Sequence, residues 1–157
     1  MSIITKKGDS GLTELIGETV HKTDLRIELI GAVDEVISHL SFANSFITSE
    51  KYIEEITICQ EALFKFNSQV AGADFEDLSK FTEYFEDSVK MNEPGSFSFS
   101  FVNHKAASCV DIARTVIRKA ERIFCKTLIE RDDLRKFINR ISDFLYIFSR
   151  LLDAEEL

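Results

Sequence analysis

Apolar residues recur every three or four positions through most of this 157-residue sequence, and that spacing restricts the chain to a mainly helical fold. The first such stripe begins after Asp24, a suitable N-cap, and continues to Ile47 along one face of a long helix. Similar stripes predict helices over about residues 50–70, 75–91, 104–130 and 133–153. We therefore expect a single all-α domain over residues 1–157, built as a five-helix bundle.

Two segments interrupt this periodicity. Residues 1–23 contain three glycines between positions 8 and 17, a density that favours turns over regular structure. Pro94 ends the third predicted helix, and the "SFSFSF" that follows, residues 96–101, alternates with the period of a strand. Because a single strand would have no partner, we interpret this stretch as an extended linker with its Phe side chains packed on one side.

Charge and cysteine content exclude several classes of protein. The formal net charge of −8 argues against a nucleic-acid partner, although a local basic stripe could hold a nucleoside triphosphate. Three cysteines without a CxxC pair indicate reduced thiols, so we expect no metal site. No apolar run approaches the roughly 18 residues of a membrane span, and the N-terminus lacks a secretory apolar core, so we expect a cytoplasmic protein.

The segment "ARTVIRKAER", residues 113–122, places four basic side chains on a helix that also needs an apolar face. A polar stripe with spacings of three and four lies beside the apolar stripe of this helix. Its members are Asp111, Arg114, Arg118, Glu121 and Arg122. One interpretation is a solvated face with ion pairs worth about 0.2–0.5 kcal/mol each. The other is a subunit interface that binds an anion.

Polar residues also lie beside the apolar seam of the fifth predicted helix, in "INRISDFLYIFSR", residues 138–150. Asn139 and Asp143 are costly in such a position unless they find partners. They could bond to the arginine stripe across the helices, or they could orient a ligand. On the first helix, Asp34 follows the apolar Val33 and also needs a cation, for which Arg114 is a candidate.

Four blocks of this sequence resemble, in the same order, motifs of the PduO-type ATP:cob(I)alamin adenosyltransferases. The blocks are "TKKGDSGLT" (5–13), "LRIELIGAVDEV" (25–36), "ARTVIRKAER" (113–122) and "INRISDFLYIFSR" (138–150). The resemblance implies a five-helix bundle with a glycine-rich N-terminal arm, assembled as a homotrimer with active sites between subunits. It implies transfer of the adenosyl group from ATP, with Mg²⁺, to the cobalt of reduced cobalamin. A reductase or a B12-dependent acceptor enzyme would be further partners.

The resemblance also implies which residues form the nucleotide site. The arm of one subunit would wrap the phosphates, and the arginine helix of its neighbour would face them. Asp34 and Arg114 match an intersubunit carboxylate–arginine pair, and with Arg118 they are the expected catalytic residues. The expected ATP-binding residues are Thr5, Lys6, Gly8, Asp9, Gly11, Lys22, Arg118, Glu121, Arg122 and Asn139. The nucleophile would be the cobalt itself, so no Ser, Cys or His nucleophile is required.

The cobalamin side of the resemblance is less complete. The family carries a Phe followed by a Pro-Gly-Gly turn before the fourth helix, and that Phe closes the lower face of the corrin ring. Here "FSFSFVNHK", residues 97–105, has no such turn, and an ungapped alignment puts Ser98 at the Phe position. Phe97 and Phe99, with Asp143, are the expected cobalamin contacts. The alternatives are a nucleotide- or corrinoid-binding carrier or sensor without turnover, and a structural helical oligomer.

Overall fold

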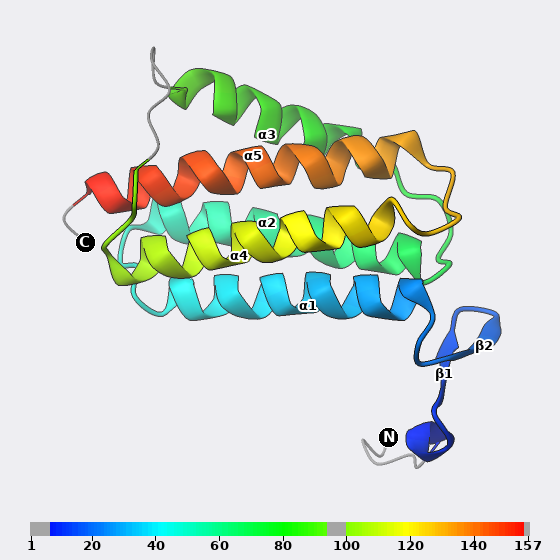
Figure 1. Ribbon diagram of the computed structural model, residues 1–157. Helices are drawn as coiled ribbons and strands as arrows, with labels where there is room; N and C mark the ends of the chain where they lie inside the picture. The colour runs from blue at the N-terminus through cyan, green and yellow to red at the C-terminus, as the bar shows by residue number, and fades with distance from the viewer. Residues whose placement is uncertain (1–6, 94–99, 156–157) are drawn as a thin grey trace.

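A computed structural model of the chain describes residues 7–93 and 100–155, and within these the predicted five-helix, all-α bundle is confirmed (Figure 1). The helices are α1 (Leu25–Asn44), α2 (Glu50–Val70), α3 (Ser79–Asn92), α4 (Lys105–Phe124) and α5 (Asp132–Ala154). Helix α4 lies between α1 and α5, α2 also packs on α1, and α3 covers the far side of α5.

Phenylalanine rings fill much of the space between α2, α3 and α5. Phe66 of α2 stacks on Phe137 of α5 with ring centroids 5.5 Å apart. Phe85 of α3 packs on Phe144, and Phe144 stacks in turn on Phe148. All five rings are buried, as their positions in the apolar stripes predict. This shared ring cluster joins three helices.

The predicted helix boundaries are right for α2 and α5 and wrong at three other ends. Helix α1 ends at Asn44 and not at Ile47, and just beyond it the Ser45 hydroxyl donates to the Phe42 carbonyl at 2.7 Å. Helix α3 begins at Ser79 and not near 75, because the Asp77 carboxylate accepts the Ser79 backbone N–H at 2.9 Å. Helix α4 ends at Phe124 and not near 130. There the Thr127 backbone N–H and hydroxyl both donate to the Phe124 carbonyl, at 3.0 and 2.7 Å, which closes the last turn.

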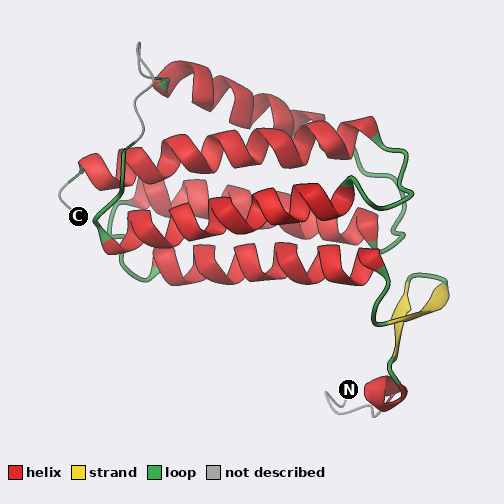
Figure 2. Cartoon of the chain, viewed as in Figure 1, coloured by secondary structure: helices red, strands yellow, loops and turns green. Residues whose placement is uncertain are grey.

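The N-terminal arm contains more regular structure than its glycines predict. A 3₁₀ helix (Lys7–Ser10) precedes two antiparallel strands, β1 (Leu12–Leu15) and β2 (Glu18–His21), so the expectation of turns alone is wrong. Gly8 lies within the 3₁₀ helix and Gly11 follows it. Gly17, between the strands, has φ +84°, a conformation that favours glycine. Figure 2 shows the hairpin outside the helical body, at the end where α1 begins.

Hydrogen bonds at two places attach the described part of this arm, residues 7–23, to the bundle. The Ile16 backbone N–H donates to the Ala71 carbonyl at 2.9 Å, just beyond the end of α2. The Arg26 guanidinium bridges Glu18 of β2, at 2.5 Å, and Asp24, at 2.8 Å. Asp24 also accepts the Arg26 backbone N–H at 2.8 Å, which confirms it as the N-cap of α1.

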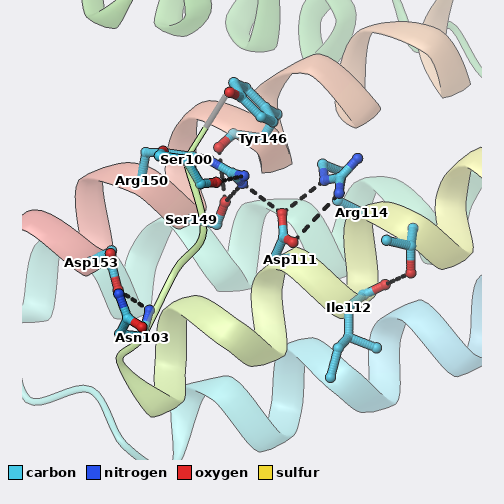
Figure 3. Close-up of polar contacts among 10 residues, drawn as sticks. Ser100, Asn103, Asp111, Ile112, Arg114, Tyr146, Ser149, Arg150 and Asp153 are labelled. Atoms are coloured by element: carbon cyan, nitrogen blue, oxygen red, sulfur yellow. Dashed lines mark hydrogen bonds and ion pairs between the residues drawn. The ribbon is translucent and has the colours of Figure 1, made fainter. Parts of the chain in front are cut away.

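Helix α4 receives its N-terminal cap from another helix. His104, the N-cap residue, makes no side-chain capping bond. The Asp153 carboxylate of α5 instead accepts the backbone N–H groups of Asn103, at 2.6 Å, and His104, at 2.9 Å (Figure 3). These two bonds, the one from His104 most of all, hold the pKa of Asp153 below its usual range. The start of α4 is therefore fixed to the end of α5.

We expect Asp153→Ala to lower the free energy of unfolding at pH 7 by about 1 kcal/mol, the usual cost of losing a helix cap. Because folding lowers the pKa of this carboxyl, its contribution is present above the unfolded pKa of about 4 and is lost as pH falls through the folded pKa. Urea unfolding at pH 7 and pH 3 measures both, with Asp87→Ala, at a 70% exposed side chain of α3, as control. An equal cost at the two pH values would contradict the capping role.

Candidate functional site

The basic segment of α4 presents most of its charge to solvent. Arg118, Lys119 and Arg122 are all exposed. Lys119 lies 3.8 Å from the Glu35 carboxylate of α1, and one Arg122 nitrogen donates to the Arg118 carbonyl at 2.9 Å. Within residues 7–93 and 100–155, the Arg118 guanidinium itself has no hydrogen bond or ion pair. Its donors are therefore available to a ligand.

Helix α5 supplies polar partners beside this segment. The Asn139 amide donates to the Glu121 carboxylate at 3.0 Å, so the predicted bonding across the helices occurs at this position. Half-buried Asp143 accepts from Arg140 at 3.0 Å. Burial raises the pKa of Asp143 above its usual range, while the positive charges of Arg140 and Arg118 oppose the rise. The positive charge of Arg118 therefore interacts electrostatically with the Asp143 carboxyl group.

Closer to the N-terminus of α4, Asp111 is the centre of a second polar group (Figure 3). Its carboxylate accepts from Arg114 Nε at 2.8 Å and from Arg150 Nη1 of α5 at 2.5 Å. The Tyr146 ring lies beneath both guanidinium groups, 3.9 Å from that of Arg150 and 5.8 Å from that of Arg114. The Arg150 guanidinium also donates to the Ser100 carbonyl at 3.0 Å. This group links α4, α5 and the segment that enters α4.

Arg114 and Asp34 do not form the pair suggested for a single chain. Asp34 is exposed on α1, and within the described ranges the carboxylate partner of Arg114 is Asp111. Asp111 takes this place because it lies three residues before Arg114 on the same helix face. Asp34 is exposed, and its carboxylate has no hydrogen bond or ion pair within residues 7–93 and 100–155.

The arm brings together part of its predicted phosphate site. The Lys22 ammonium lies 2.9 Å from where a Cβ on Gly8 would be, so the lack of a side chain at Gly8 makes room for it. Gly11, at φ +80°, donates to the Gly8 carbonyl and accepts from the Lys22 backbone N–H. Asp9 is exposed beside them. Thr5 and Lys6, also predicted here, lie outside the described residues.

Within a single subunit, the described part of the arm, residues 7–23, does not bond to the basic segment of α4, residues 114–122. Figure 1 shows the arm extending away from the bundle, and within the described residues no hydrogen bond or ion pair connects residues 7–23 to residues 114–122. The two predicted halves of the nucleotide site are therefore separate within the monomer.

The linker residues predicted to contact cobalamin, Phe97 and Phe99, also lie outside the described residues. The next ring, Phe101, is 81% exposed. Within residues 7–93 and 100–155, no group of three or more His, Cys, Asp or Glu side chains is placed to hold a metal ion. No described helix is long and apolar enough to cross a membrane.

Sequence patterns alone did not reveal the bond between Asp111 and Arg150. The two residues are 39 positions apart on different helices, so no spacing rule relates them. Arg150 follows the same polar stripe of α5 as Asn139 and Asp143, which is the one signal that could have drawn attention to it.

Comparison with known proteins gives consistent matches over nearly the whole chain. The model of the family described as cobalamin adenosyltransferase matches residues 3–152. A corrinoid adenosyltransferase of Citrobacter freundii is 29% identical over 95% of this chain and 93% of its own length. The corrinoid adenosyltransferase PduO of Salmonella typhimurium is 31% identical over 99% of this chain, which spans only 51% of that relative.

Solved structures agree with the sequence matches. A variant PduO-type ATP:corrinoid adenosyltransferase from Lactobacillus reuteri, in complex with cobalamin and ATP, superposes on this chain with a TM-score of 0.87. The two are 28% identical, and the match covers 97% of this chain and 93% of the other. The likeness therefore includes the arm as well as the helical bundle.

Proposed function

This chain belongs to the cobalamin adenosyltransferase family, and on that premise we propose that it transfers the 5′-deoxyadenosyl group of ATP to the cobalt of a reduced corrinoid. In this reaction a cobalt–carbon bond forms, the carbon–oxygen bond at the 5′ position breaks, and triphosphate leaves. The observation that carries the proposal is the exposed basic face of α4, where Arg118 has no partner among the described residues. A polyanionic leaving group is the ligand such a face suits best.

The proposed site requires two subunits. The arm and the basic helix are apart within one chain, and Asp34 faces outward without Arg114. We propose a homotrimer in which the arm of one subunit reaches the α4 face of its neighbour, where Asp34 of one subunit meets Arg114 of the other. Gly8 and Gly11 would let backbone N–H groups approach phosphate oxygens, and Lys22 would add a positive charge.

Each residue of the α4 face has a distinct proposed role. Arg118 and Arg122 bind triphosphate oxygens, and they stabilise the charge that grows on the leaving group as the bond breaks. Glu121, held by Asn139, contacts the nucleoside part of ATP. Mg²⁺ enters with ATP as part of the substrate, because it usually keeps several waters and binds through phosphates. Thr5, Lys6 and Asp9 stay predicted members of the phosphate arm.

On the corrin side we keep Asp143, Phe97 and Phe99 as proposed contacts. Burial raises the pKa of Asp143, and Arg140 holds its carboxylate with a hydrogen bond of 3.0 Å. The missing Pro-Gly-Gly turn before α4 favours one other candidate function, a carrier or sensor that binds nucleotide and corrinoid without turnover. A cytoplasmic location, a reductase and a B12-dependent acceptor enzyme also stay predictions.

An anaerobic assay with chemically reduced cob(I)alamin and Mg-ATP tests the activity directly, since formation of the cobalt–carbon bond changes the absorbance. We expect multiple turnovers. Absence of turnover with micromolar ATP binding in calorimetry would favour the carrier or sensor. Absence of both would leave only a structural oligomer.

We expect Asp34→Ala to weaken ATP binding about tenfold or more and to weaken the trimer, because it leaves the neighbour's Arg114 without its intersubunit carboxylate. Calorimetry measures the ATP affinity and sedimentation velocity measures the assembly. Glu35→Ala is the control, since Glu35 is the adjacent exposed acid and its ion pairs within the described residues are long, 3.8 Å to Lys119 and 4.0 Å to His39. Unchanged ATP affinity and unchanged assembly in Asp34→Ala would rule out the pairing.

A further inference from the structure

Arg150 has no role in the proposed reaction, yet its side chain contacts α4, the segment that enters α4, and Tyr146 of its own helix. Its side chain is 19% exposed. Nη1 donates to Asp111 of α4 at 2.5 Å and to the neighbouring Ser149 hydroxyl at 2.7 Å, and Nη2 donates to the Ser100 carbonyl at 3.0 Å (Figure 3). Its flat face lies 3.9 Å from the Tyr146 ring centroid. Arg150 therefore has one fixed position and orientation.

Asp111 is shared between two cations. Burial raises the pKa of Asp111, but the hydrogen bonds from Arg114 and Arg150 outweigh it and hold the pKa below its usual range, so the group is a carboxylate at neutral pH. Two guanidinium groups around one carboxylate leave a net charge of one positive unit. The Arg114 contacts are uneven: Nε is 2.8 Å from one oxygen, which Arg150 also holds, and Nη2 is 3.4 Å from the other.

We propose that Arg150 is a positioning residue for Arg114. By holding the shared Asp111 oxygen, Arg150 keeps that carboxylate from closing into a symmetric pair with Arg114. Asp111 thus orients Arg114 without cancelling its positive charge. Arg114 needs this charge for its proposed pairing with Asp34 of another subunit. The bond to Ser100 extends the same restraint to the segment entering α4. The proposal rests on the proposed function only for the role of Arg114; the positioning itself does not depend on it.

Arginine side-chain NMR tests the positioning without any assay of activity. The Arg114 Nε–H signal in a ¹H–¹⁵N spectrum is assigned by its loss in Arg114→Lys. In Arg150→Met we expect this signal to move downfield, because its acceptor oxygen is no longer shared. Arg135→Met, at a 56% exposed arginine of the same helix, is the matched control and should leave the signal in place. An unmoved signal in folded Arg150→Met would overturn the proposal.

Steady-state kinetics test whether the positioning of Arg114 by Arg150 matters for the reaction with ATP. We expect Arg150→Met to lower kcat/KM for ATP by about tenfold to a hundredfold, the range that small misplacements in a site produce. Arg150→Lys should recover part of the loss, and Arg135→Met should behave as the unsubstituted protein. Asp111→Asn should cost less in the Arg150→Met background than in the unsubstituted protein, because Arg150 acts on Arg114 through Asp111. If their losses multiply instead, Arg150 acts independently of Asp111 and the proposal is wrong.

The two measurements separate this proposal from the proposed function. If the unsubstituted protein shows no turnover, the proposed function fails, while the NMR signal still decides whether Arg150 positions Arg114. If Arg150→Met does not fold, Arg150→Lys replaces it in the NMR test. Lysine keeps the charge but loses the planar fork that reaches both Asp111 and Ser100, so the Arg114 signal should still move. An unmoved signal in that variant would also overturn the proposal.

Discussion

Replacing Arg118 with alanine is expected to lower kcat/KM for ATP by about 10²–10³-fold while the protein stays folded and assembled, the usual effect of removing one donor to transition-state charge. Arg118 is exposed on α4 and has no hydrogen bond or ion pair within the described parts of the chain. Its removal therefore leaves no buried group without a partner. The whole loss should fall on ATP binding and turnover.

Two further variants distinguish the loss of the Arg118 guanidinium from the loss of any exposed arginine. Arg118→Lys keeps the charge but loses the fork that binds two phosphate oxygens, so we expect an intermediate loss. Arg135→Ala removes an exposed arginine from α5 and should leave both kinetics and ATP affinity unchanged. Circular dichroism and sedimentation confirm folding and assembly. If activity and ATP affinity of Arg118→Ala stay within twofold of the unsubstituted protein, Arg118 is not a phosphate ligand.

Phe66→Ala is expected to lower the free energy of unfolding by about 3–5 kcal/mol, the cost of a large cavity in a close-packed core. Phe66 is fully buried and packs on Phe137 of α5, at 5.5 Å, and on Phe124 of α4, at 6.0 Å. Since domains of this size are stable by about 5–15 kcal/mol, this one change should remove much of the total.

A matched control for this change lies two residues away on the same helix. Phe64 is 69% exposed, so Phe64→Ala removes the same atoms without opening a cavity and should change the free energy of unfolding by less than about 0.5 kcal/mol. Urea unfolding at one protein concentration compares the two variants. A loss below about 1 kcal/mol for Phe66→Ala would mean that the ring cluster does not hold α2 to α5 as described.

The helical fold was predictable because long apolar stripes leave few alternatives to a bundle. Its errors occur where short-range bonds decide the outcome: Asp77 starts α3 late, and Thr127 closes α4 early. The hairpin of the arm was not predicted because each strand has only four residues and a single glycine between them marks the turn. Such short strands carry little periodic signal.

The candidate site was predictable residue by residue but not as an arrangement. The stripe pattern placed Arg114, Arg118 and Glu121 on one side of α4, which is correct. It also contained Asp111, three residues before Arg114 on the same face, and these two residues form the ion pair within the chain. It could not show the bond from Arg150 to Asp111, 39 residues away, because periodicity describes one element at a time and this contact depends on how two helices lie against each other.

The attachment of the arm has a thermodynamic consequence. Leu15 and Val20 of the hairpin are buried, yet neither belongs to the apolar cluster of the bundle. The links of the hairpin to the helices are the Ile16–Ala71 bond and the Arg26 bridge. Breaking these few contacts should cost far less than unfolding the bundle, so we expect the chain to unfold as two cooperative units. We expect the hairpin to open on its own, with fast amide hydrogen exchange, while the helices stay protected.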